Sequence, residues 1–428
     1  MNTPASFFRA WEHPFGATLR WLCATALLCL AANAMAQSIM VSDPALALAP
    51  RVVQQSTLND SPLALNYKDA VSGTPIEFGG FRIYPSLAVR YMRATGLPVE
   101  TGVSVDTSIT TVTPAITAEL GQHWILNYSP SWVTYSNKSM TDSVNQSFQL
   151  NGATTTVSGW DLKISEGFQS SNDTIPETAQ QTKQNTWTTN LSADHKFGQR
   201  SSYEGSASMN DHYGVGFNDT RDWSTRQFLN MKMTEKTSAG LGIALGYTEI
   251  SHAADMDYVQ YLGQLNWQST KKIALSAQGG IENRHSMSAS AHDVSNPILQ
   301  VSLGYQPFDH TRITLTDFSN VSSSFYDNTI TKNKGWSLAL NQRLLEKLNL
   351  DLSYSEQTND YLGFGANSPN NSVNGRSDDV KSFNATLSVV VFKKWSVAAI
   401  YQSSKDDSNQ IGYRSSTTQY GIELRGRF

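Results

Sequence analysis

The chain has 428 residues and a formal net charge of −4, from 32 Lys and Arg against 36 Asp and Glu. Charged residues are 16% of the chain, below the roughly 25% typical of globular proteins, whereas aromatic residues reach 10%. No basic run indicates nucleic-acid binding, and after the first 36 residues no stretch approaches the roughly 18 consecutive apolar residues of a membrane-spanning helix.

The N-terminus has the pattern of a secretory signal peptide. Arg9 and Arg20 precede an apolar run at 21–32, and a small-x-small sequence, Ala-Met-Ala, follows at 34–36. The run is about a dozen residues long, which is too short to cross a bilayer as a helix. These parts in this order predict a signal peptide over residues 1–36, with a buried N-terminal helix as the alternative.

Both cysteines, Cys23 and Cys29, fall within this predicted leader. Residues 37–428 therefore contain no thiol. Disulfide scaffolds, cysteine zinc sites and cysteine nucleophiles are excluded for that part of the chain.

Alternation of apolar and polar residues dominates the chain from residue 79 onward. It is clear at 123–132 (HWILNYSPSW), 272–281 (KIALSAQGGI), 298–307 (ILQVSLGYQP), 336–345 (WSLALNQRLL) and 348–357 (LNLDLSYSEQ). In the last of these, Leu348, Leu350, Leu352 and Tyr354 fall on one face. A period of two predicts strands with one apolar and one polar face.

Short turns and longer polar connections separate these strands in alternation. The short turns lie near residues 121, 198, 237, 270, 308, 346 and 393, and the spacing predicts another near 151–156. The longer connections include 360–380 and 404–416. Eight hairpins, a first strand at 81–92 and a last strand at 420–428 predict eighteen strands, with sixteen as the alternative.

This organisation predicts an all-β fold, a transmembrane antiparallel β-barrel over residues 79–428 with short periplasmic turns and long extracellular loops. A soluble propeller or sandwich is the alternative, but such folds bury apolar strands in a dry core. Residues 37–78 contain several prolines and little alternation. We expect them to form a periplasmic extension that is either disordered or folded back toward the lumen.

The C-terminal strand, YGIELRGRF at 420–428, has one apolar and one charged face. In hydrocarbon every backbone polar group must pair, so the last strand is expected to close onto the first, with Tyr420, Ile422 and Leu424 facing lipid. Phe428 would then lie at the inner membrane boundary. A final strand of this kind resembles the signal that bacterial outer-membrane proteins present to their insertion machinery, although Gly426 occupies a position that is usually bulky.

The sequence predicts no catalytic, metal or cofactor site, and the chain is not expected to be an enzyme. The nearest candidate for catalysis is AHDVSNP, but His292 and Ser295 are three apart and would point to opposite faces of a strand. Acidic pairs at 378–379 and 406–407 are expected in the outer loops. They would bind Ca²⁺ or bridge to lipopolysaccharide, or else be solvated loop charge, the preferred interpretation.

The face opposite the lipid is expected to line a polar lumen. Its predicted basic residues are Arg82, Arg90, Arg226, Lys232, Arg343, Arg425 and Arg427, and its fewer acidic residues are Glu282, Asp351 and Glu423. Arg82, Arg425 and Arg427 should meet near the periplasmic mouth, because the first and last strands are neighbours. They would either attract anions into a pore or pair with Glu423 or Asp351.

The hairpin LGYQPFDHTRITLTDFSN, 303–320, with Tyr305 and Pro307, resembles the β-barrel porin-2 family. The resemblance extends over about 79–428 and implies an outer-membrane location, contact with lipid and lipopolysaccharide, and export of extracellular polysaccharide alongside a periplasmic polysaccharide-export protein. The predicted function is therefore an aqueous channel for such export. The alternatives are an outer-membrane lipid-modifying enzyme and a structural or adhesive barrel.

Overall fold

A computed structural model describes residues 75–428, except 176, 252, 288–292, 325, 327–328, 346, 364–374 and 393. The predicted signal peptide and residues 37–74 of the predicted extension lie outside the described residues. No helix in the described part of the chain is long and apolar enough to cross a membrane. One short 3₁₀ turn, η1, covers Ile411–Tyr413.

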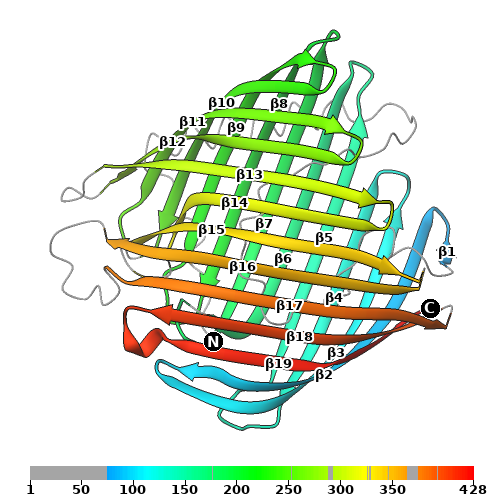
Figure 1. Ribbon diagram of the computed structural model, residues 1–428, viewed down its shortest axis with the longest axis vertical. Coiled ribbons are helices and arrows are strands. Elements are labelled where there is room, and N and C mark those ends of the chain that lie inside the picture. The colour runs from blue at the N-terminus through cyan, green and yellow to red at the C-terminus, as the bar shows by residue number, and fades with distance from the viewer. Residues whose placement is uncertain are drawn as a thin grey trace.

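The strands form a closed antiparallel barrel (Figure 1). They are β2 Phe81–Glu100, β3 Val103–Leu120, β4 Trp124–Tyr135, β5 Ser143–Thr155, β6 Trp160–Ile175, β7 Gln180–Phe197, β8 Ser201–Gly214, β9 Thr220–Thr234, β10 Thr237–Ile250, β11 Met256–Thr270, β12 Ile273–Ser286, β13 Val294–Phe308, β14 Thr311–Ser323, β15 Thr329–Leu344, β16 Leu348–Gly363, β17 Ser377–Phe392, β18 Trp395–Ser408 and β19 Ser415–Arg427. Each pairs with the next, and β19 pairs with β2 from Arg427 opposite Ser86 to Thr418 opposite Thr95. The prediction of eighteen strands in a closed barrel is confirmed.

A further short strand, β1 Ile76–Phe78, precedes the barrel and pairs with the start of β2. Gly79, with φ of +60°, turns the chain between the two strands. A positive φ is available to glycine without the clash that a Cβ would cause. The last residues of the predicted N-terminal extension therefore belong to the sheet.

The two ends of the barrel differ in their connections. The end that carries the hairpin turns after β3, β5, β7, β9, β11, β13, β15 and β17 is called the turn end. Seven of these turns lie where the sequence predicts them, whereas the turn predicted near 151–156 lies later, at 156–159, because β5 extends to Thr155. Phe428 is also at this end, where its N–H donates to the Pro85 carbonyl at 3.0 Å. The opposite end, called the loop end, carries the connections that follow β16 and β18 and a two-residue turn at Thr101 and Gly102.

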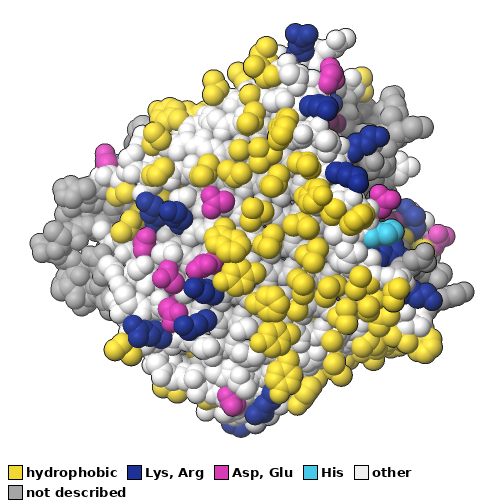
Figure 2. Space-filling view, viewed as in Figure 1, with side chains coloured by type: hydrophobic (Ala, Val, Ile, Leu, Met, Phe, Trp, Pro, Cys, Tyr) yellow, Lys and Arg dark blue, Asp and Glu magenta, His cyan; other side chains and the backbone are white. Residues whose placement is uncertain are grey.

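The outward face carries the apolar side chains and the inward face the polar ones. On β19, Tyr420 and Ile422 are 54% and 61% exposed. Glu423, which lies between Ile422 and Leu424, is 1% exposed. The predicted orientation of this strand is therefore confirmed. Figure 2 shows apolar side chains gathered in the middle of the front face and toward the turn end, with acidic and basic side chains together toward the loop end at left.

A row of outward aromatic side chains bounds the apolar band toward the loop end. On neighbouring strands it consists of Trp336, Tyr354, Phe383, Tyr401 and Tyr420. The ring centroids of Trp336 and Tyr354 are 5.4 Å apart. Beyond this row lie outward ion pairs, such as Lys381 with Glu356 at 3.0 Å and Lys405 with Asp407 at 2.6 Å.

Candidate functional site

The interior of the barrel is filled in its loop-end half. An apolar cluster of buried side chains joins β2, β3, β4 and β18, and it contains Met92, Leu97, Ile109, Val133 and Ile400. A second cluster is built from Ile250, Met256 and Ile330. The burial of apolar side chains on the inner face stabilises the packing of this half and excludes water from it.

The tip of the β2–β3 hairpin contributes to this filling because a bulge bends it inward. The register between β2 and β3 shifts between Ala94 and Leu97, and Gly96 between them has φ of +69°. A Cβ at Gly96 would lie 2.1 Å from the carbonyl oxygen of Ser416, so the position requires glycine. Beyond the bulge, Thr174 of β6 donates to the carbonyl of Pro98 at 3.0 Å, and so the tip reaches strands several places around the barrel.

A cluster around Arg376 joins loop-end connections from opposite sides of the barrel. The Arg376 guanidinium lies 3.7 Å from the ring centroid of Tyr413 and 4.6 Å from that of Tyr361. It also donates to Asp378 Oδ1 at 2.9 Å and to the Glu177 carbonyl at 2.7 Å. Planar stacking, charge pairing and hydrogen bonding together are the interactions for which Arg is suited.

Tyr326 extends the same cluster from the β14–β15 connection. Its hydroxyl donates to the Glu177 carbonyl at 3.1 Å and lies 3.3 Å from the hydroxyl of Tyr413. Burial is the main cause that raises the pKa of Tyr326, and the contact with Tyr413 raises it further, so the hydroxyl keeps its proton. We call Glu177, Tyr326, Arg376 and Tyr413 the Arg376 latch. It ties the β6–β7, β14–β15, β16–β17 and β18–β19 connections together.

The acidic pairs that the sequence placed in outer loops lie in strands instead. Asp378 is in β17 and Asp406 in β18, and both are buried on the inner face, whereas Asp379 and Asp407 face outward. The expectation of loop charge was wrong because β17 begins before Asp378 and β18 extends past Asp407, and alternation within each strand then places the two neighbours on opposite faces. The described residues contain no group of three or more His, Cys, Asp and Glu side chains that could hold a metal ion.

The inward face toward the turn end carries charged side chains, some of them half exposed. Arg82 of β2 pairs with Glu119 of β3 at 2.8 Å, and Lys163 of β6 lies 3.5 Å from Asp194 of β7. The side chains of Arg82 and Lys163 are about half exposed, at 53% and 49%. We call this half, lined by inward side chains such as these, the turn-end vestibule.

The three predicted mouth arginines lie on the inner face of β2 and β19. They differ in exposure and in pairing, so they do not form a uniform arc of positive charge. Arg425 is 7% exposed and lies 3.4 Å from Glu423, which also accepts from Arg90 at 2.9 Å. Arg82 is paired with Glu119. Arg427 is opposite Ser86 of β2, and its N–H donates to the Lys394 carbonyl at 2.8 Å.

Sequence reasoning missed Glu119 because the register between β2 and β3 depends on the bulges near Gly96. The available signal was Thr101-Gly102, a dipeptide suited to a hairpin turn that pairs β2 with β3. A hairpin at that position brings residues near 119 opposite residues near 82.

The remaining predicted lumen residues lie on the inner face, but they are balanced by acids. Arg226, Lys232 and Arg343 project inward by the alternation of β9 and β15, and Lys232 pairs with Glu235 at 2.7 Å. Glu282 is buried and accepts from Arg284 at 2.9 Å and from Gln260 at 2.6 Å. Inward acids beyond those predicted include Glu119, Asp161, Asp194, Glu204, Asp222, Asp378 and Asp406. The expected excess of basic side chains on this face was therefore wrong.

The segment considered for catalysis is described only in part. His292 lies outside the described residues. Ser295 is in β13, and by the alternation of that strand it shares the outward face with Leu299. Asp293 lies 2.5 Å from the ring nitrogen of His285.

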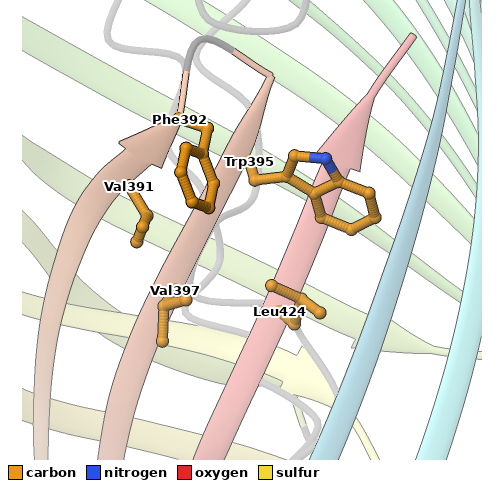
Figure 3. A pocket seen from close by; sticks show the side chains of 5 residues that line it. All are labelled: Val391, Phe392, Trp395, Val397 and Leu424. Atoms are coloured by element: carbon orange, nitrogen blue, oxygen red, sulfur yellow. The ribbon is translucent and has the colours of Figure 1, made fainter.

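The C-terminal strand accommodates Gly426 beneath an aromatic ring. Gly426 is opposite Trp395 in the β18–β19 pair, and a Cβ on the glycine would lie 2.9 Å from that ring. The Trp395 ring therefore covers the outward side of Gly426. Figure 3 shows Trp395 beside a shallow apolar hollow on the outward face, lined also by Val391, Phe392, Val397 and Leu424.

No protein-family model matches the chain, and no curated protein matches its sequence. Solved structures that it resembles include the copper transporter OprC, with 8% identity and a TM-score of 0.42 over 78% of this chain and 62% of OprC. The FrpB iron transporter from Neisseria meningitidis has 11% identity and a TM-score of 0.41 over 80% of this chain and 64% of FrpB. OccK2 (OpdF) from Pseudomonas aeruginosa, solved in complex with glucuronate, has 11% identity and a TM-score of 0.46 over 81% of this chain and 98% of OccK2.

The matched region spans less than two thirds of OprC and of FrpB. At such low identity and with TM-scores below 0.5, these likenesses carry no argument about function. The resemblance of the hairpin at 303–320 to the β-barrel porin-2 family remains a prediction.

Proposed function

We propose that this chain is an outer-membrane β-barrel that forms an aqueous channel of the porin type. The observation that carries the proposal is the closed sheet with an apolar outward band and a polar inward face. A closed sheet leaves no unpaired edge in hydrocarbon, and the 13 residues of β19 exceed the roughly 9–11 that a tilted strand needs to span it. The turn end would then face the periplasm.

The two halves of the interior support a channel that is closed at rest. The turn-end vestibule offers a polar, water-accessible path, whereas the apolar clusters and the Arg376 latch fill the loop-end half. Passage of a solute would require the β2–β3 tip and the latched connections to move. Loops and other moving elements belong to the low-stability parts of a structure, so contacts between loops can open at a small cost in free energy.

We propose export of a polysaccharide as the transport function, following the resemblance to the porin-2 family. Inward amides and hydroxyls support this assignment, for example Asn266 and Ser276, which are joined by a 2.8 Å hydrogen bond. Such groups can exchange hydrogen bonds with sugar hydroxyls. A periplasmic polysaccharide-export protein would then dock at the turn end.

Further proposed partners follow from the outward face. The apolar band would contact lipid, and the charged side chains beyond the aromatic row, such as Lys381 and Lys405, would contact the phosphates of lipopolysaccharide. The β19 strand that ends at Phe428 would be presented to the barrel-insertion machinery.

The filled loop-end half favours a second candidate function, a structural or adhesive barrel that presents its loop end to a partner. A lipid-modifying enzyme would rest on His292, which lies outside the described residues, and nothing else in the described part of the chain favours it.

Reconstitution in planar bilayers tests the channel. We expect small or intermittent conductance from the unaltered protein and larger steps from an Arg376→Ala variant. Polysaccharide added on the turn-end side should reduce the current of the open variant. A correctly assembled barrel that conducts in neither form would overturn the channel and support the structural candidate.

A further inference from the structure

The outward face of β6–β9 differs chemically from the rest of the apolar band. Polar and small residues gather there at middle depth, and we call the following six residues the β6–β9 strip: Glu166, Thr189, Gly205, Ala207, Thr225 and Gln227. Their outward position follows from pairing with outward neighbours, since Phe168 beside Glu166 is opposite Trp187. The strip therefore interrupts an otherwise apolar surface.

Contacts within the strip satisfy part of its hydrogen-bonding capacity. The Thr189 hydroxyl donates to Glu166 Oε2 at 2.7 Å, and the Gln227 amide donates to the Thr225 hydroxyl at 2.7 Å. Tyr203 folds over Gly205 and donates to the Gln227 carbonyl oxygen. A carboxylate accepts at roughly four lone-pair sites, so Thr189 provides Glu166 with a fraction of what it can accept.

Such a surface is unfavourable against lipid and favourable against protein. A carboxylate that faces hydrocarbon loses its hydration, whereas polar and small side chains gather where membrane segments pack against one another. The opposite wall provides the contrast. Outward positions of β12 and β13 at similar depth are apolar, including Leu275, Ala277, Val301 and Leu303.

Asp317, an outward acid on another part of the wall, provides a comparison for Glu166. Asp317 of β14 is opposite Val301 on one side and Trp336 on the other. Its cross-strand neighbours are apolar, whereas Glu166 is opposite Thr189. The clustering of acceptors and donors is confined to β6–β9 in this comparison.

The depths of the polar groups identify the occupant of the strip. Glu166 lies six residues from the turn-end limit of β6 at Trp160, and Gln227 lies seven residues from the turn-end limit of β9 at Thr234. The two side chains are therefore at nearly equal depth, at opposite edges of the strip. A two-fold axis parallel to the barrel axis and passing between β7 and β8 places β6 of one copy opposite β9 of the other.

We propose that a second copy of this chain packs against the β6–β9 strip about this axis. Glu166 of each copy would accept from the second N–H of the Gln227 amide of the other copy, twice across the interface, because the Thr225 hydroxyl already donates to the Ser206 carbonyl at 3.1 Å. The small Gly205 and Ala207 would let the two walls approach closely. The inference rests on the membrane location proposed above and goes beyond it to the assembly that the barrel forms.

Single-cysteine cross-linking in native membranes tests the interface, because residues 37–428 contain no cysteine. Ala207→Cys places a thiol in the centre of the strip, and Ala277→Cys places one outward on β12 as a matched control. With a short bis-maleimide we expect at least ten-fold more product of twice the chain mass from Ala207→Cys than from the control. The unaltered chain should give none.

A second substitution separates an interface from a lipid-facing wall. In the Ala207→Cys background, Glu166→Leu should lower the cross-linked fraction several-fold, while Glu166→Gln should retain much of it because an amide oxygen still accepts. If the strip faces lipid, Glu166→Leu should instead leave the low cross-linking unchanged and raise resistance to denaturation.

Equal, low cross-linking at both positions in a conducting barrel would overturn the inference and leave the proposed channel standing. Cross-linking of Ala207→Cys to a product of another mass would also overturn it, since a different protein would then occupy the strip. Absence of the chain from the outer-membrane fraction would overturn the proposed function itself.

Discussion

Arg90 of β2 and Glu423 of β19 join the first and last strands of the closed barrel from inside, with 2.9 Å between Nε and Oε2. Both side chains are buried, and the same carboxylate lies 3.4 Å from Arg425. One acid thus neutralises part of the charge of two guanidiniums at the seam. This ion-pair cluster adds to the backbone pairing of β2 with β19 that closes the barrel.

We expect Glu423→Gln to destabilise the barrel by about 3–5 kcal/mol, the typical cost of removing one member of a buried ion pair. Denaturant unfolding followed by tryptophan fluorescence provides the measurement. Lys405→Gln is the control, because its outward pair with Asp407 is exposed and such pairs contribute only about 0–1 kcal/mol. Equal stability of the two variants would show that the seam ion pair is dispensable.

Replacing Arg82, Arg425 and Arg427 with Gln should shift the ion selectivity of an open channel toward cations. Arg82 should contribute more to the shift than Arg425, because Arg82 is 53% exposed whereas Arg425 is buried beside Glu423. Reversal potentials across a salt gradient measure the effect, which should weaken with salt because charges are screened over about 8 Å at physiological ionic strength.

Arg93→Gln serves as the control for this selectivity, since Arg93 is opposite the outward Tyr420. An assembled triple variant with unchanged selectivity would mean that the three arginines act as wall fillers and ion-pair partners.

Arg376→Ala should loosen the loop-end closure. The substitution removes the contacts with Tyr361 and Tyr413 and the hydrogen bond to the Glu177 carbonyl. Single-channel conductance and the uptake of a bulky hydrophilic antibiotic by cells should both rise by several-fold. Lys381→Ala, which breaks the outward ion pair between Lys381 of β17 and Glu356 of β16, should leave both quantities unchanged. A closed Arg376→Ala channel would show that the apolar clusters suffice to seal this end.

Phe428→Ala should reduce the amount of assembled barrel in the outer membrane. The Phe428 ring meets that of Trp395 at a centroid distance of 6.0 Å, and its N–H donates to the Pro85 carbonyl. The substitution removes the terminal aromatic group and leaves the backbone pairing of β19 intact. Membrane fractionation with heat-modifiable gel mobility measures assembly, and Phe392→Ala, at the turn end of β17, is the control. Full assembly of the Phe428 variant would contradict a role in insertion.

The strand pattern was predictable because it is local. Alternation at 348–357 shows in the sequence which side chains face outward, and turns such as that at Gly121 follow from the residues between strands. The pairing of Arg82 with Glu119 was not predictable, because it depends on bulges between Ala94 and Leu97 and between Pro98 and Glu100. The position of Asp378 was also misjudged, since the start of β17 cannot be read from the polar sequence around it.

From the sequence alone we predicted a closed barrel of eighteen strands, with sixteen as the alternative and with an apolar exterior and a polar interior, and the structure confirms eighteen. The reason is that a period of two and the need to pair every backbone group act residue by residue along the chain. Whether the interior is open or filled follows instead from side chains that meet across the barrel, as Arg376 meets the Glu177 carbonyl. These contacts across the barrel depend on the curvature of the whole sheet and on the inward bend at Gly96. No short stretch of sequence encodes them.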